Sequence, residues 1–285
     1  MIMDIKFTKM QAYGNDYVYV DAINQRIDDP NALALKISDR HFAVGSDGLV
    51  MLCEATVPEA DFRMRMFNPD GSEGEMCGNA LRSVSMFAYY YGFTKKENLV
   101  METLGGLQYV KLHVENGEVV NITADIGCPR LKASEVPVNT KLQEFINEEI
   151  KIADKTFRAS SLSWGNPHTV IFVNDTDSFD VHKYGPLIEH ATDIFPKKTN
   201  VTFAQIIDDK NIKMREWERG TGETIGCGTG CCTAAVYASI LGLAGKHVDV
   251  EQIGGKLHVD WDDDGHVRMT GPSHVVFEGV YRYEA

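Results

Sequence analysis

Hydrophobic and polar positions along the chain form two series of similar elements. Residues 6–22 (KFTKMQAYGNDYVYVDA) contain two β-prone runs around a Gly-Asn-Asp break, and residues 161–175 (SLSWGNPHTVIFVND) repeat this design around Gly-Asn-Pro. Such runs, interrupted by turn residues, predict related pairs of strands. Residues 79–92 and 229–245 are rich in small, aliphatic and aromatic residues, end at Gly and are apolar on most faces, which predicts two helices enclosed by a sheet.

The segment before each predicted helix is also repeated. RMRMFNPDGSEGEMCGN (63–79) and KMREWERGTGETIGCGTG (213–230) each run from an alternating strand into a glycine-rich loop that ends at a cysteine. The two cysteines lie 227 − 77 = 150 positions apart. Self-similarity at a fixed offset indicates a duplicated unit. The same offset pairs Met64 with Met214, Arg65 with Arg215, Phe67 with Trp217, Glu73 with Glu223 and Cys77 with Cys227, and Gly14-Asn15 recurs as Gly165-Asn166 at an offset of 151.

These patterns predict an α/β (α+β mixed) fold of two pseudo-symmetric domains, each a mixed sheet wrapped around a central buried helix. A chain of 285 residues with 44% hydrophobic content has a length near which single cores tend to split. The polar, Pro-containing segment 124–145 lies between the copies and places the boundary near Asp125 to Pro129. We therefore expect an N-terminal domain over 1–125, a C-terminal domain over 126–270 and a tail, 271–285, that returns to the first domain.

Each repeated thiol, Cys77 and Cys227, is predicted at the first turn of a buried helix. That position leaves backbone N–H groups unpaired and carries a partial positive charge of roughly +0.5. Such a site favours a lowered thiol pKa and binding of a carboxylate, and Gly78 and Gly228 keep the backbone accessible. Two thiols on opposite sides of one carbon could remove a proton from one face and return one to the other, which inverts a stereocentre.

Charge and hydropathy restrict the partners and the compartment. The formal net charge is −13 and the Lys/Arg residues form only short pairs, so nucleic acid and anionic membrane surfaces are poor partners. The first ten residues, MIMDIKFTKM, lack the apolar run of a secretory signal. The most apolar stretch, 231–245, is shorter than the ~20 residues that span a bilayer. We expect a soluble, cytoplasmic protein whose cysteines are reduced.

These motifs together resemble the diaminopimelate epimerase family. MQAYGNDYVYVD resembles its first strand and loop, MFNPDGSEGEMCGNALR its first cysteine motif, GNPH its second Asn motif and ERGTGETIGCGTG its second cysteine motif, in order through nearly the whole chain. The resemblance implies the fold that this family shares with proline racemase and phenazine-biosynthesis isomerase. It also implies interconversion of LL- and meso-2,6-diaminopimelate in lysine and peptidoglycan biosynthesis, without pyridoxal phosphate, other cofactors or metal, by a homodimer.

The resemblance also carries residue roles. Cys77 and Cys227 correspond to the acid/base pair, which exchange roles with reaction direction. His168 and Glu218 match positions that tune the two thiols. The carboxylate at the reacting centre is expected on the helix ends at Gly78, Asn79, Gly228 and Thr229, and the remaining substrate contacts fall on Asn15, Asn68, Asn166, Asn200, Glu218 and Arg219.

The sequence departs from the family pattern at one position and leaves alternatives open. Many members have Gln where this chain has Gly48 in GSDG, so a side-chain contact is lost or supplied otherwise. A racemase of the same fold acting on another amino acid, such as histidine, is one alternative. A thiol-redox or metal-binding module built on CxxxCC at 227–232 is another. The other cysteines, Cys53, Cys128, Cys231 and Cys232, are expected to be small buried hydrophobic residues.

Overall fold

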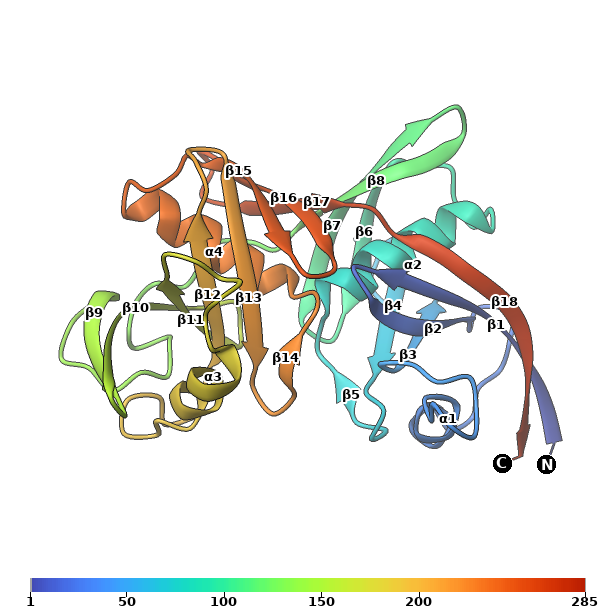
Figure 1. Ribbon diagram of the computed structural model, residues 1–285. Helices are drawn as coiled ribbons and strands as arrows, with labels where there is room; N and C mark the ends of the chain where they lie inside the picture. Colours follow the sequence, from blue (N-terminus) through green and yellow to red (C-terminus); the bar gives the residue numbers. More distant parts are fainter. Residues whose placement is uncertain (1, 285) are drawn as a thin grey trace. The chain divides into compact units, whose positions relative to one another are not determined.

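The computed structural model describes residues 2–284 of the chain (Figure 1). The chain divides into two compact units. Unit 1 comprises Met1–Asp125 and Thr270–Ala285, and unit 2 comprises Ile126–Met269. Strand β17 (Val267–Gly271) contains the second point at which the chain passes from one unit to the other.

Unit 1 is a mixed sheet with two helices. Its strands pair in the order β18-β1-β2-β3-β4-β6-β7-β8, with the short β5 beside β4. The β2–β3 and β4–β6 pairs are parallel and the others antiparallel. The elements are β1 (Ile2–Ala12), β2 (Asn15–Asp21), α1 (Pro30–Ile37), β3 (Leu49–Cys53), β4 (Phe62–Phe67), β5 (Glu73–Gly74), α2 (Gly78–Tyr90), β6 (Asn98–Thr103), β7 (Gly106–Glu115), β8 (Glu118–Asp125) and β18 (His274–Glu284).

From β10 to β16, unit 2 repeats the order of elements that runs from β1 to β7 in unit 1. Its strands pair as β9-β10-β11-β12-β13-β15-β16, with β14 beside β13, and the parallel pairs are β11–β12 and β13–β15. In both units a helix separates the strands of each parallel pair, so the sequence repeat corresponds to a repeat of topology. The elements are β9 (Phe145–Ile152), β10 (Lys155–Ser163), β11 (Pro167–Phe172), α3 (Val181–Glu189), β12 (Asn200–Ile206), β13 (Asn211–Glu218), β14 (Gly222–Thr224), α4 (Gly228–Ile240), β15 (His247–Gln252) and β16 (Gly255–Trp261).

A buried helix lies against the sheet of each unit. α2 contacts β1–β4 and β6–β8, and α4 contacts β11–β13, β15 and β16. The mixed α/β fold class expected from the sequence, with each sheet around a central helix, is confirmed. α2 and α4 have 13 residues each, and no helix within residues 2–284 has the length and apolar character needed to span a membrane.

Both faces of the central strands are covered, which explains their nearly continuous apolar runs. In β2, Val18 and Val20 belong to the cluster that packs with α1, whereas the alternate residue Tyr19 stacks on Phe87 of α2, with ring centroids 6.3 Å apart. Successive side chains of a strand point to opposite faces. The run YVYV therefore places its valines on one face and its tyrosines on the other, both buried.

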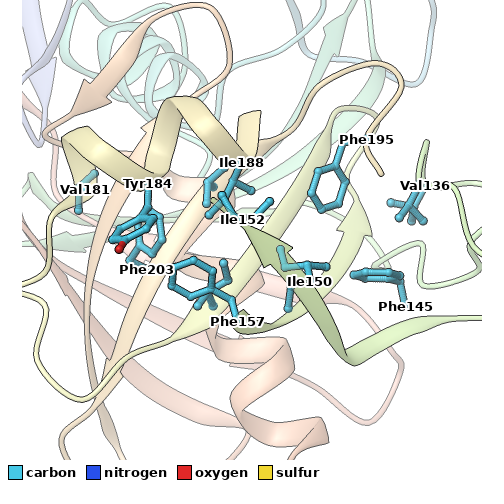
Figure 2. Packing of buried hydrophobic residues seen from close by; sticks show 14 residues of the cluster. Val136, Phe145, Ile150, Ile152, Phe157, Val181, Tyr184, Ile188, Phe195 and Phe203 are labelled. Carbon is cyan, nitrogen blue, oxygen red and sulfur yellow. The ribbon is translucent and has the colours of Figure 1, made fainter. Parts of the chain in front are cut away.

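The core of unit 2 under α3 supports strand β13. Val181, Tyr184 and Ile188 of α3 pack against the sheet (Figure 2). Trp217 of β13 lies at the margin of this cluster, and its indole N–H donates to Glu189 Oε2 at 2.8 Å. Because side chains alternate along β13, the residues on either side of Trp217 point to the opposite face, toward α4.

Candidate functional site

Both repeated cysteines occupy the N-cap position of a central helix. Cys77 precedes α2 with φ −137° and ψ 123°, and Cys227 precedes α4 with φ −122° and ψ 106°. The carbonyl of each cysteine accepts the first helical hydrogen bond, Leu81 N–H at 2.8 Å and Cys231 N–H at 3.1 Å. The amides of the first turn have no acceptor inside their helix and suit an anion. The predicted carboxylate-binding residues Gly78, Asn79, Gly228 and Thr229 lie in these first turns.

The repeated Arg and Glu residues hold the loops that lead to the cysteines. Arg65 donates to both carboxylate oxygens of Glu73 at 2.8 Å. Arg215 donates to those of Glu223 at 2.6 and 3.0 Å. Each bidentate pair joins the long strand to the short strand that precedes the cysteine, and bidentate pairs of this kind fix geometry as well as adding energy. These four residues therefore shape the loops.

In unit 1 the Cys77 thiol lies next to a series of hydrogen-bonded polar side chains that begins at Asn15. Cys77 Sγ is 3.5 Å from Asn15 Oδ1, and Asn15 Nδ2 donates to Asp47 Oδ2 at 2.8 Å. Arg40 bonds both Asp47 and Asp16 at 2.8 and 2.7 Å, and Lys9 pairs with Asp16 at 2.5 Å. Since Asp47 accepts from the amide nitrogen, the amide oxygen of Asn15 is the atom directed at the thiol.

The predicted contact Asn68 lies at the turn between β4 and β5. Its backbone N–H donates to Ser72 O at 2.8 Å and its side-chain amide donates to Ser72 Oγ at 2.9 Å. The amide of Asn68 is therefore fixed by the hairpin that leads to Cys77, and its Oδ1 is not used in either bond.

Gly48, the departure from the family pattern, is required by the backbone. Its φ is +148°, and a Cβ at this position would lie 2.1 Å from Phe67 O and 2.9 Å from the Tyr17 ring. A side chain rarely adopts this φ and would meet main-chain atoms that cannot move aside. The local backbone thus excludes the Gln that many family members carry.

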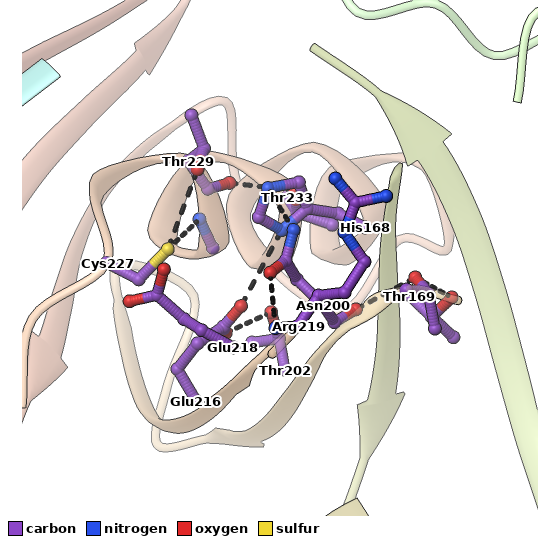
Figure 3. A network of polar contacts seen from close by, with 12 residues as sticks. His168, Thr169, Asn200, Thr202, Glu216, Glu218, Arg219, Cys227, Thr229 and Thr233 are labelled. Carbon is purple, nitrogen blue, oxygen red and sulfur yellow. Dashed lines mark hydrogen bonds and ion pairs between the residues drawn. The ribbon is translucent and has the colours of Figure 1, made fainter. Parts of the chain in front are cut away.

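In unit 2 the Cys227 thiol is buried beside carboxylates (Figure 3). Cys227 Sγ accepts from Gly230 N–H at 3.4 Å and lies 3.5 Å from Thr229 Oγ1. Burial raises the pKa of Cys227 well above its ordinary value, and the charges of Glu218 and then Glu216 raise it further, against the opposing effect of the two hydrogen bonds. The expectation that the helix end lowers the thiol pKa is wrong for Cys227, which holds its proton at neutral pH.

Glu216 belongs to the site, although the sequence motifs did not predict it. It lies two positions before Glu218 on the same face of β13 and is only 1% exposed. Its Oε2 accepts from Thr202 Oγ1 at 2.5 Å, and its Oε1 lies 3.6 Å from His168 Nδ1. Gly230 makes room for it, since a Cβ there would lie 2.5 Å from the carboxylate. The alternation Glu-Trp-Glu was a usable signal, but the corresponding position in the first copy, 216 − 150 = 66, is Met66, so the repeat did not reveal it.

A hydrogen-bonded network joins most of the predicted residues of unit 2. Asn200 Oδ1 accepts from Arg219 N–H at 2.9 Å, and its Nδ2 donates to Pro167 O at 3.0 Å and lies 3.4 Å from His168 Nε2. Glu218 Oε1 accepts from Thr224 Oγ1 at 2.6 Å. The structure thus brings His168, Asn200, Glu218 and Arg219 around the Cys227 loop.

Two predicted contacts have exposed side chains. Arg219 is solvent-exposed, and its guanidinium donates to Lys197 O at 3.1 Å. Asn166 is also exposed, in the turn between β10 and β11. Both side chains are accessible to a ligand that binds at the surface of unit 2.

The remaining cysteines fall into three environments. Cys231 and Cys232 are fully buried in α4, as expected for small hydrophobic residues. Cys53, at the end of β3, is half-buried. Cys128 is exposed, and the prediction of burial is wrong there because the residue lies in the irregular segment after β8.

Solved structures of several isomerases share this fold. The structure of a phenazine biosynthesis protein of the PhzF family from Bacillus anthracis matches with a TM-score of 0.71 and 20% identity, over 98% of this chain and 99% of that one. A probable proline racemase from Agrobacterium radiobacter K84 matches with a TM-score of 0.66 and 14% identity, over 96% and 92% of the two chains. The chain therefore has the fold of the class that includes PhzF proteins and proline racemases.

The family follows from closer relatives. The family model for diaminopimelate epimerase matches residues 7–132 and 160–276. A diaminopimelate epimerase of Methanococcus maripaludis (strain C5) is 48% identical over 276 residues, 96% of this chain and 99% of that protein. One from Desulfovibrio desulfuricans is 46% identical over 288 residues, 99% of each. The chain belongs to the diaminopimelate epimerase family, which confirms the resemblance found in the sequence and favours an amino-acid isomerase over a redox or metal-binding module.

Proposed function

We propose that the chain is a cofactor-independent epimerase that interconverts LL- and meso-2,6-diaminopimelate. The observation that supports it most is the pair of N-cap cysteines, Cys77 and Cys227, in equivalent strand–loop–helix units of a chain from this family. Inversion at a carbon needs one group that accepts a proton and one that donates a proton on the opposite face. Two equivalent thiols meet that requirement in both directions.

The reaction consists of two proton transfers. The thiolate of one cysteine takes the proton from the α-carbon, which breaks the C–H bond and forms an S–H bond. The electron pair moves into the adjacent carboxylate, and the thiol of the other cysteine then protonates the carbon on its other face. The first-turn amides at Gly78, Asn79, Gly228 and Thr229 would hold the carboxylate and stabilise the charge that develops on it.

The surroundings of Cys227 support the role of proton donor in the free protein. Burial, Glu218 and Glu216 keep its pKa raised, so this thiol begins as the acid and Cys77 acts as the base in the corresponding direction. After one turnover the proton positions are exchanged. Glu218 thus acts on the thiol through its charge, and His168 acts through Glu216, which it faces at 3.6 Å.

The distal half of diaminopimelate needs a second set of contacts. Its carboxylate requires donors and its ammonium requires acceptors, at a fixed distance from the reacting carbon. Arg219 has an exposed guanidinium that donates to the Lys197 carbonyl, and the adjacent Glu218 offers carboxylate oxygens. We assign the donors to Asn68, Asn166, Asn200 and Arg219, and the principal acceptor to Glu218. We assign Asn15, whose amide oxygen faces the Cys77 thiol, to a substrate contact near the reacting carbon.

The partner and the compartment are part of the proposal. We propose a cytoplasmic homodimer that serves lysine and peptidoglycan precursor synthesis. Strand β18 pairs with β1 along one edge and exposes Val276, Phe277 and Val280, which are 46–59% accessible. Apolar side chains gathered on one strand are typical of a protein interface. Sedimentation equilibrium should give a mass near twice 31.8 kDa; a monomer at micromolar concentration would refute the dimer.

The proposed activity is tested directly with purified protein. LL-diaminopimelate should be converted to a mixture with the meso isomer, measured by chiral chromatography. A panel of single amino acids, histidine included, should be racemised far more slowly. If histidine or another single amino acid were the better substrate, the chain would be a racemase of the same fold.

A further inference from the structure

The turn between β15 and β16 holds the loop that carries Cys227. Gly254 N–H donates to Ile225 O at 2.6 Å. Two residues earlier, Gln252 Oε1 accepts from the backbone N–H of Cys227 at 2.8 Å. The loop is therefore fixed at two points, one of them the N-cap residue itself. A backbone N–H can only donate, so the atom of Gln252 that faces it must be the amide oxygen.

Gln252 is an unusual residue for this place in the core. It is 6% exposed, and its Nε2 has no hydrogen-bond partner among residues 2–284. A buried donor without a partner costs free energy, so the hydrogen bond that the amide oxygen accepts must offset that cost. That oxygen also lies 3.4 Å from Cys231 Sγ, one turn along α4. The single acceptor thus touches both the N-cap cysteine and the first turn of the helix.

In the equivalent turn of unit 1 the corresponding side chain bonds within the turn instead. Gly105 N–H donates to Glu75 O at 3.0 Å, as Gly254 does to Ile225. At the position of Gln252, 252 − 149 = 103, unit 1 has Thr103, and its hydroxyl donates to Gly106 O at 2.8 Å within its own turn. The backbone contact is therefore duplicated, whereas the side chain two residues earlier bonds the cysteine in unit 2 and its own turn in unit 1.

An N-cap residue needs an external restraint. Its φ and ψ are not helical, so the helix does not fix its N–H group. Movement of the Cys227 backbone would move both the thiol and the amides of Gly228 and Thr229 that follow it. We propose that Gln252 is a positioning residue for Cys227, which keeps the thiol buried beside Glu218 and the next amides directed at the substrate carboxylate. The kinetic part of this inference rests on the proposed function.

The test compares three variants by two measurements. Gln252→Met keeps the length of the side chain and removes the acceptor, Gln252→Glu keeps an acceptor and adds charge, and Thr103→Val is the matched control in unit 1. The first measurement is kcat and KM for LL-diaminopimelate. The second is the rate of alkylation by iodoacetamide at Cys227 and Cys77, resolved by mass spectrometry of the peptides.

The two Gln252 variants should change the rate of Cys227 alkylation in opposite directions. Gln252→Met should lower kcat at least about 10-fold with a smaller change in KM, because small displacements of a reacting group are costly. It should also speed alkylation of Cys227 by about 3-fold as the thiol becomes exposed. Gln252→Glu should slow that alkylation, since a nearby negative charge disfavours the thiolate. A merely structural role would expose the thiol in both variants.

The outcomes separate this inference from the proposed function. It is overturned if Gln252→Met leaves kcat and Cys227 alkylation within about 2-fold of wild type. It is also overturned if Cys77 responds as strongly as Cys227, or if Thr103→Val has the same effect. If wild type does not epimerise diaminopimelate but the alkylation pattern holds, the proposed function fails and the positioning role stands.

Discussion

The two thiols occupy the same position in two units of the same topology, yet their surroundings differ. Cys77 is half-buried and lies against an amide oxygen, that of Asn15. Cys227 is buried beside two carboxylates, and Gln252 holds its backbone. The duplication therefore determines where each thiol sits, whereas the residues that differ between the copies determine its acidity and its restraint.

Three positions contribute to this difference. The charges of Glu218 and then Glu216 raise the pKa of Cys227 where unit 1 has the uncharged Asn68 and Met66, and Gln252 bonds Cys227 where unit 1 has Thr103. A two-base reaction gains from this asymmetry, because one thiol must begin with a proton and the other without one.

The largest expected effect comes from removing either thiol. Cys77→Ala and Cys227→Ala should each lower epimerisation at least about 1,000-fold, because neither thiol can supply both the acid and the base. Chiral chromatography after incubation with each isomer measures this. Cys231→Ala, at a buried cysteine of α4, is the matched control for Cys227→Ala and should keep most of the activity. Substantial epimerisation by either Cys77→Ala or Cys227→Ala would rule out the two-base mechanism.

The second effect concerns the Arg–Glu pairs that hold the loops. Arg215 bonds Glu223 and also the carbonyls of Thr176 and Phe179, at 3.1 and 3.0 Å, while Arg65 bonds Glu73. Arg215→Ala should therefore cost about 2–3 kcal/mol of stability and Arg65→Ala about 1 kcal/mol. Thermal melts of both variants compare the two losses. Equal losses would mean that the additional carbonyl contacts contribute nothing.

The third effect concerns substrate recognition. Arg219→Ala removes a charge-assisted contact and should lower kcat/KM for diaminopimelate at least about 10-fold, while Cys77 and Cys227 alkylate as in wild type. Arg158, an exposed arginine of the same unit paired with Glu149, provides the matched control in Arg158→Ala. An amino acid without a distal carboxylate should be turned over slowly by wild type, and neither Arg219→Ala nor Arg158→Ala should change that rate much. A loss shared by such a substrate would argue against distal recognition.

The smallest effect concerns the pH dependence of the buried thiol. Burial and then Glu218 raise the pKa of Cys227, so the reactive thiolate appears only at alkaline pH. Glu218→Gln removes one negative charge, which favours the thiolate and shifts the alkylation profile of Cys227 to lower pH. At pH 8 its alkylation rate should rise by about 3-fold while that of Cys77 stays constant. A shift to higher pH would contradict the charge argument.

Much of the fold was predictable from the sequence because its signals are local and repeated. The break at Gly14-Asn15 predicted the β1–β2 hairpin, where Ala12 pairs with Asn15. The apolar runs after Cys77 and Cys227 predicted the helices, since few polar positions leave a helix no face for water. The extended N-cap conformation of both cysteines agrees with the loop-to-helix transition read from the motifs.

The electrostatics of the site could not be predicted in the same way. The motifs placed Cys227 at a helix end, but its burial and the nearby charges of Glu218 and Glu216, which raise its pKa, depend on tertiary packing. The role of Gln252 depends on a turn 25 residues downstream that folds back onto the loop. At Gly48 the sequence showed a missing side chain, while the structure gives the reason in a contact with Phe67 O. The acidity of Cys227, the contact of Gln252 and the space at Gly48 all depend on residues distant in sequence, which the local motifs do not show.

The central claim is that two thiols act on one carbon from opposite faces, and isotope incorporation tests it most directly. LL-diaminopimelate is incubated with the enzyme in D2O, and product and recovered substrate are analysed by mass spectrometry at low conversion. The account predicts one deuterium in the meso product and almost none in the recovered LL isomer, because the thiol that donates is not the one that took the proton. Equal deuterium in both isomers at early times would show a single base serving both faces and would contradict the account.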